Sequence, residues 1–131
     1  MRIGWIRRLF GNQGERVAAR YLKQQGYRIL ARQLRMRQGE IDLVAMDKET
    51  FVFVEVKTRS SHAKGHPSEA VDYSKQRQIT LTALAWMKRK KILHKSGRFD
   101  VIAITWPVNG RPEIDHYKNA FVAVGNGQFY S

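Results

Sequence analysis

Apolar and polar positions alternate along the middle of this chain in the pattern typical of β-strands. Apolar side chains recur at every second position in residues 40–46 and 51–58, and the second of these segments is largely apolar on both faces. A strand of that kind is expected to be buried on both sides of a sheet. Strands are also predicted at 27–36, 99–106 and 114–117 from their apolar and β-branched content.

Helical spacing appears on either side of these strands. The first helix is predicted at 12–25, where Gly26 ends it, and a second at 74–93. Because the antiparallel strands before the second helix must connect through it to the next strand, the order predicts an α/β fold with a mixed sheet. We expect one domain over residues 12–131, preceded by a basic N-terminal arm at 1–11.

Three charged side chains interrupt the two central strands. Asp42 lies in the first, and Glu55 and Lys57 lie in the second, where a charge is unfavourable unless it has a partner or a task. A hairpin loop of two or four residues places Asp42 opposite Glu55, with side chains roughly 5 Å apart, and Glu40 opposite Lys57. We favour four residues because the turn at 47–50 has no glycine. A loop of three or five residues would turn the two acids to opposite faces.

Each of these acids also has a plain explanation. The hairpin charges could be solubilising groups on an exposed face, although the apolar residues on both sides of 51–58 argue against that. Glu15 shares a helix face with Ala18, Ala19 and Leu22 and so points toward the sheet, but an acid in a first helical turn also complements the helix dipole. Glu40 could pair with Lys57 or hold a metal-bound water.

The net charge favours a polyanionic partner. Lys and Arg number 24 against 11 Asp and Glu, which gives a formal charge of +13 on 131 residues, and such an excess attracts nucleic acid. The candidate contact residues flank the hairpin or begin the second helix: Arg35, Arg37, Arg59, Lys64, Lys75 and Arg77. The basic run at 88–91 is explained by the dipole at a helix C-terminus.

Several function classes are excluded by missing features. The chain has no cysteine, so it has no disulfide, thiolate zinc site or cysteine nucleophile, and it has no phosphate-binding loop for ATP. Its apolar runs are too short for a signal peptide or an integral membrane segment. We therefore expect a cytoplasmic protein.

Five segments in this order resemble the YraN family of uncharacterised bacterial proteins. They are the glycine, acid and small-residue pattern at 11–22 and the segments 26–30, 39–44, 52–59 and 98–101. That family is similar to the archaeal Holliday-junction resolvases and to the restriction-endonuclease-like fold. The resemblance therefore implies a single restriction-endonuclease-like domain with a central mixed β-sheet flanked by helices.

The resemblance also implies roles for individual residues. Asp42 and Glu55 match acidic metal ligands, Glu15 matches the acid of the N-terminal helix, and the main-chain carbonyl of Val56 would be a further ligand. Lys57 matches the lysine of the acid-x-lysine element. By the same analogy Lys75 and Gln76 face the substrate, with Gln76 and Glu40 as second-tier candidates.

These ligand types predict a metal-dependent reaction on phosphate. Hydrolysis of a phosphodiester needs a hard cation with oxygen ligands, for which Mg²⁺ is the natural ion and Mn²⁺ the expected substitute. We expect an endonuclease acting on DNA, with branched or structured DNA implied by the junction resolvases and a homodimer suited to a two-fold junction. The alternatives are a noncatalytic nucleic-acid-binding protein with the same fold and, with less support, a ribosome- or membrane-associated module.

Overall fold

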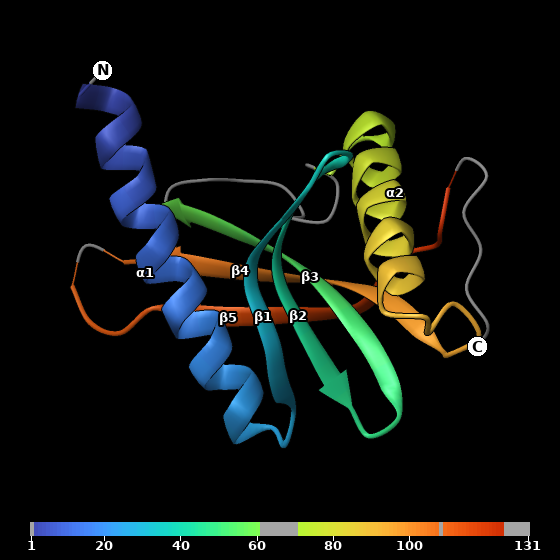
Figure 1. The fold of residues 1–131 in the computed structure, drawn as a ribbon. Coiled ribbons are helices and arrows are strands. Elements are labelled where there is room, and N and C mark those ends of the chain that lie inside the picture. The colour runs from blue at the N-terminus through green and yellow to red at the C-terminus, as the bar shows by residue number, and fades with distance from the viewer. Residues whose placement is uncertain (1, 61–70, 108, 125–131) are drawn as a thin grey trace.

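A five-stranded sheet with one helix against each face forms the protein in the computed structural model (Figure 1). The structure describes residues 2–60, 71–107 and 109–124, with side chains from residue 13 onward. Its elements, in chain order, are α1 (Arg2–Gln24), β1 (Arg28–Met36), β2 (Gly39–Asp47), β3 (Thr50–Ser60), α2 (Tyr73–Arg89), β4 (Gly97–Trp106) and β5 (Glu113–Phe121).

The strands lie in sequence order across the sheet. All neighbouring pairs are antiparallel except β3 and β4, which are parallel and are connected through α2. This arrangement confirms the predicted α/β fold with a mixed sheet flanked by helices. It is consistent with the restriction-endonuclease-like fold.

Three element boundaries differ from the prediction. α1 begins at Arg2 and so includes most of the segment expected to be an arm. α2 ends at Arg89 because Lys91 adopts a positive φ of 61° and Ile92 donates its N–H to the Met87 carbonyl, a helix stop that usually has glycine. β5 extends to Phe121, and the polar residues in its second half hid it from the sequence pattern.

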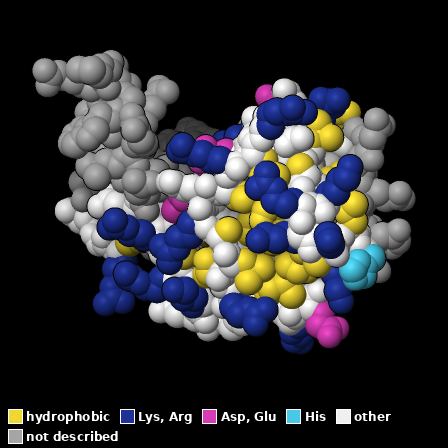
Figure 2. Space-filling model, in the orientation of Figure 1, with side chains coloured by type: hydrophobic (Ala, Val, Ile, Leu, Met, Phe, Trp, Pro, Cys, Tyr) yellow, Lys and Arg dark blue, Asp and Glu magenta, His cyan; other side chains and the backbone are white. Residues whose placement is uncertain are grey.

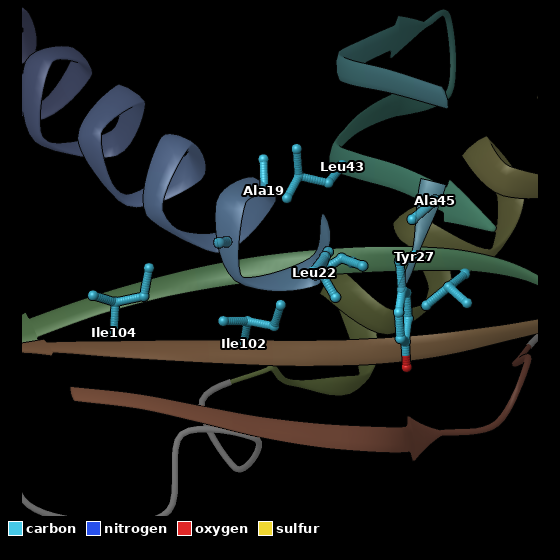
Figure 3. Close-up of a cluster of buried hydrophobic side chains, with 10 residues drawn as sticks. Ala19, Leu22, Tyr27, Leu43, Ala45, Ile102 and Ile104 are labelled. Atoms are coloured by element: carbon cyan, nitrogen blue, oxygen red, sulfur yellow. The ribbon is translucent and has the colours of Figure 1, made fainter. Parts of the chain in front are cut away.

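Each helix covers a different face of the sheet because alternate residues of a strand point to opposite sides. α1 packs Ala19 and Leu22 against Leu43, Ile102 and Ile104 (Figure 3). On the other face, α2 packs Ile79, Ala83 and Met87 against side chains of β2, β3 and β4. The strand residues of this cluster are Val44, Phe53, Phe99 and Val101.

Two glycines allow close approaches beside the central strands. Gly14 brings α1 against β3, since a Cβ atom there would lie 2.5 Å from Thr58 Cγ2. Gly39 has a positive φ of 153°, and a Cβ there would lie 2.6 Å from the Gln78 side chain of α2. The tip of the β1–β2 hairpin therefore packs on α2, and Figure 1 shows the hairpin bending away from β3 to reach it.

Candidate functional site

The candidate site lies where β2 and β3 separate. Their antiparallel ladder runs from Asp47 paired with Thr50 to Leu43 paired with Val54, which is the predicted register. The loop has two residues and not the four that we favoured, because Lys48 adopts a positive φ of 56° without needing glycine. Both loop lengths give the same register, so the pairing was unaffected.

Asp42 ends the ladder with its own side chain. If the pairing of Leu43 with Val54 were continued by two residues along each strand, Ile41 would pair with Val56. Instead the Val56 N–H donates to Asp42 Oδ2 at 2.8 Å. Because the N–H and C=O of one strand residue point toward the same neighbour, the Val56 carbonyl also faces this side of β3.

Asp42 and Glu55 interact directly across this separation. Glu55 is buried, and Asp42 is half-buried beside it. Burial and then the negative charge of Glu55 raise the pKa of Asp42 to about 8, although the Val56 N–H opposes the shift. Without a cation, Asp42 therefore keeps a proton at neutral pH and can donate it to Glu55.

Two lysines approach the same oxygen of Glu55 from different elements. Lys57 Nζ lies 3.6 Å from Glu55 Oε2, and Lys75 Nζ lies 3.8 Å from it. Lys57 follows Glu55 on the same face of β3, whereas Lys75 is in the first turn of α2, which Asp72 caps by accepting from the Lys75 N–H. The site thus combines a buried acid pair with two ammonium groups.

Glu15 reaches the site from α1. Gln33 Nε2 donates to Glu15 Oε2 at 3.2 Å. Burial raises the pKa of Glu15, and the charges of Glu40 and Glu55 add to the effect against the Gln33 hydrogen bond and Arg32. Glu15 is therefore close enough to interact with the acid pair. Gln33 was given no role in the site by the sequence analysis.

Glu40 is the residue whose predicted partner was wrong. It forms an ion pair with Arg35 of β1, with Arg35 Nε 3.5 Å from Glu40 Oε2, and not with Lys57. The reason is that the β2–β3 ladder stops at Leu43, so Glu40 never lies opposite Lys57, while β1 pairs Arg35 directly with Glu40.

The other predicted contact residues are distributed over several elements. Arg37 lies in the turn at the tip of the β1–β2 hairpin, and Arg77 is exposed on α2. Gln76 donates to the Val71 carbonyl at 2.8 Å. Arg59 is held at the far end of β3 by Thr105 and, at 3.9 Å, by Asp115. Lys64 lies outside the described residues.

A second polar network is buried at the other end of the sheet. Arg98 donates to Asp100, Asp47 and the Tyr27 hydroxyl, and His116 Nε2 lies 2.7 Å from Asp100 Oδ2. Burial alone would raise the pKa of Asp100, but hydrogen bonds from His116, Arg98 and the Asn119 N–H lower it. This network joins β2, β4 and β5 to Tyr27, which lies between α1 and β1.

The donor set at the acid pair suits a hard cation better than a soft one. In the described residues, no three acidic or histidine side chains are grouped closely enough to hold one metal ion. Asp42, Glu55 and a main-chain carbonyl nevertheless offer only oxygen ligands, and Mg²⁺ is often bound by one or two carboxylates with water completing its shell. Asp42, Glu55 and the Val56 carbonyl would suit Mg²⁺ as ligands, and a ligand role for Glu15 stays a prediction.

These features are together consistent with a nuclease-like α/β domain: the mixed sheet, the helix on each of its faces, and the cluster of acids and lysines where β2 and β3 separate. Comparison with known proteins gives the family. The chain belongs to the uncharacterised protein family UPF0102, whose model matches residues 14–104.

Its relatives are similar over most of their length. A UPF0102 protein of Geobacter sulfurreducens is 51% identical over 114 residues, covering 87% of this chain and 89% of the relative. Another from Rhodopirellula baltica is 47% identical over 92% of this chain and 74% of its own, and one from Rhodococcus opacus is 45% identical over 85% and 94%. Across the part of the chain that the structure describes, neither helix is long and apolar enough to cross a membrane.

Proposed function

We propose that this protein is a metal-dependent endonuclease that hydrolyses phosphodiester bonds in DNA. The observation that carries the proposal is the contact between Asp42 and Glu55 at the point where β2 and β3 part, with Lys57 and Lys75 on the same Glu55 oxygen. Two neighbouring carboxylates repel each other when both are ionised, and a divalent cation bound between them would remove that repulsion.

Asp42, Glu55 and the Val56 carbonyl would hold Mg²⁺, or Mn²⁺ in its place. When bound, the ion supplies charge neutralisation for the phosphate and a water of lowered pKa. Lys57 supplies a positive charge next to the acid pair, where charge would develop on the phosphate. Lys75 holds Glu55 from the helix side, so the carboxylate is positioned by two elements.

The alternative is a noncatalytic nucleic-acid-binding protein with a nuclease-like fold. Two observations favour it. The described residues contain no group of three metal-binding side chains, and Lys57 and Lys75 already balance the charge of Glu55. In that case the site would be a structural cluster of ion pairs, and phosphate binding would fall to the basic surface.

Cleavage assays separate the two functions. Labelled four-way junction, flap, single-stranded and duplex DNA would be incubated with protein in Mg²⁺, Mn²⁺ or EDTA. We expect metal-dependent cutting by the wild type, loss of cutting with DNA binding intact in Asp42→Asn and Lys57→Met, and no change in Lys95→Met, which removes an exposed lysine elsewhere. Binding by every variant with no metal-dependent cutting of any substrate would establish the noncatalytic alternative.

Two finer expectations stay predictions within this proposal. Branched DNA is expected among the substrates, and a two-fold symmetric junction would suit a homodimer. If the four-way junction is the preferred substrate, it should be cut at symmetric positions on opposing strands, and the protein should sediment as a dimer. Cutting on one strand by a monomer would remove the junction from the proposal while leaving the hydrolysis.

A further inference from the structure

A groove between α1 and β1 has basic side chains on its walls. One part of it has a volume of about 320 Å³ and is lined by Arg16, Arg20, Lys23 and Arg32. Figure 2 shows Lys and Arg side chains gathered over this half of α1 and the neighbouring strand. Arg16, Arg20 and Lys23 follow helical spacing at i, i+4 and i+7, a signal present in the sequence that had received no role.

The groove leads toward the acid pair. A second hollow of about 230 Å³ shares Arg16 and Arg32 with the first and adds Glu15 and Gln33. Glu15 in turn interacts electrostatically with Asp42 and Glu55. The groove therefore has four cations along its length. Glu15 lies at one end of it, and the proposed metal site lies beyond Glu15.

Three of these cations do not balance an acid: among the described side chains, no acid forms an ion pair with Arg16, Arg20 or Lys23. All four are exposed, and Arg32 acts on Glu15 only by its charge. By contrast, Arg35 and Arg98 each pair with a carboxylate. Like charges lining one groove repel each other, and an anionic ligand relieves that repulsion.

We infer, building on the function proposed above, that this groove binds the phosphodiester backbone of the nucleic-acid strand that enters the site. From Arg16 to Lys23 the helix rises about 10 Å. One strand of a duplex carries a phosphate for roughly every 3.4 Å of helix axis, so beside a duplex that length matches about three phosphates. Arg32 of β1 contacts the same strand from the opposite wall. Since the contacts are to phosphates, binding here is independent of base sequence.

The test measures binding without cleavage. Fluorescence anisotropy in EDTA, with labelled single-stranded and duplex oligonucleotides at several salt concentrations, would compare wild type with Arg16→Gln/Arg20→Gln/Arg32→Gln. The matched control, Lys88→Gln/Arg89→Gln/Lys90→Gln, removes the same charge from exposed positions at the C-terminal end of α2. Circular dichroism melting would verify that both variants fold.

We expect the groove variant to bind about 10- to 100-fold more weakly and its salt slope to fall by about 2 to 3, while the control changes by less than about threefold. Equal losses in both variants would show that only net charge matters and would overturn the groove. Unchanged binding by the groove variant would also overturn it. Binding to anionic phospholipid vesicles would be measured in parallel. If the groove variant lost binding only to these vesicles and not to the oligonucleotides, the proposal would also be overturned, because the partner would then be a membrane surface.

The outcome is distinguishable from failure of the endonuclease proposal. If the wild type cuts no substrate but the groove variant loses nucleic-acid binding, the groove stands and the hydrolysis falls. If Asp42→Asn abolishes cutting while the groove variant binds and cuts as the wild type does, the hydrolysis stands and the groove falls.

Discussion

Removing the charge of Asp42 should stabilise the metal-free protein at high pH. Burial and Glu55 raise the pKa of Asp42 from 3.8 to about 8, so folding takes up a proton over that interval. A group with a raised folded pKa stabilises the fold below its unfolded pKa and loses that stabilisation as the pH rises through the folded pKa. Wild-type stability should therefore fall relative to Asp42→Asn between about pH 4 and pH 8.

The size of the effect follows from the shift. One pKa unit corresponds to about 1.4 kcal/mol, so the three units between pH 5 and pH 8 set an upper limit of about 4 kcal/mol. Asp42 is half-buried, and solvent reduces the effect, so we expect about 2 kcal/mol. Asparagine keeps an oxygen that can accept from the Val56 N–H, which preserves the end of the β2–β3 ladder.

Urea unfolding followed by tryptophan fluorescence in EDTA would measure this at about pH 5 and pH 9. Asp72→Asn is the matched control, because Asp72 is an exposed helix cap at which asparagine serves equally well. A stability difference for Asp42→Asn that is the same at both pH values, or of opposite sign at pH 9, would refute the reasoning. Adding Mg²⁺ at pH 9 should stabilise the wild type and not the variant.

Four further predictions concern the surroundings of the site and the second polar network. Gly14→Ala should destabilise by about 1 to 2 kcal/mol because its Cβ would lie 2.5 Å from Thr58 Cγ2. Helix propensity alone would instead stabilise the variant by about 1 kcal/mol. If the clash is the cause, adding Thr58→Ser to Gly14→Ala should restore stability in chemical denaturation, because serine lacks the Cγ2 atom. Lys57→Met with Lys75→Met should destabilise by about 1 kcal/mol more than the two single changes summed, because both neighbours of the buried Glu55 are then lost; an additive double-mutant cycle would contradict this. Arg98→Met should cost about 3 to 5 kcal/mol by leaving Asp100 buried without its cation. Because the pKa of Asp100 is lowered, wild-type stability should fall below about pH 4 by more than that of Asp100→Asn, and parallel acid-unfolding curves would contradict the role of the network.

The sequence predicted the register of the hairpin because period-two alternation leaves few choices. Once Val52 and Val54 face one side and Phe53 and Glu55 the other, only loops of even length bring Asp42 to Glu55. The loop itself was mispredicted because Lys48 tolerates a positive φ that glycine usually supplies.

What the sequence could not supply was the point at which the ladder stops. Alternation continues from Gly39 to Asp47, so nothing local shows that β2 leaves β3 at Asp42 and bends toward α2. That bend depends on the tip packing at Gly39 and Gln78, which are far apart in the chain. The mistaken Glu40–Lys57 pair follows from it, because Glu40 pairs with Arg35 of β1 instead.

The functional explanation depends on Glu55 more than on Asp42. Asp42 has structural work in the fold, since its carboxylate accepts the Val56 N–H where the ladder ends, and asparagine could do the same. Among the described residues, no main-chain N–H donates to Glu55, which is buried beside another acid and held by two lysines. An apolar residue would suit that strand position better on stability alone. The proposed metal site gives a carboxylate at this position, next to Asp42, a reason to be there, because the two acids would bind one cation together.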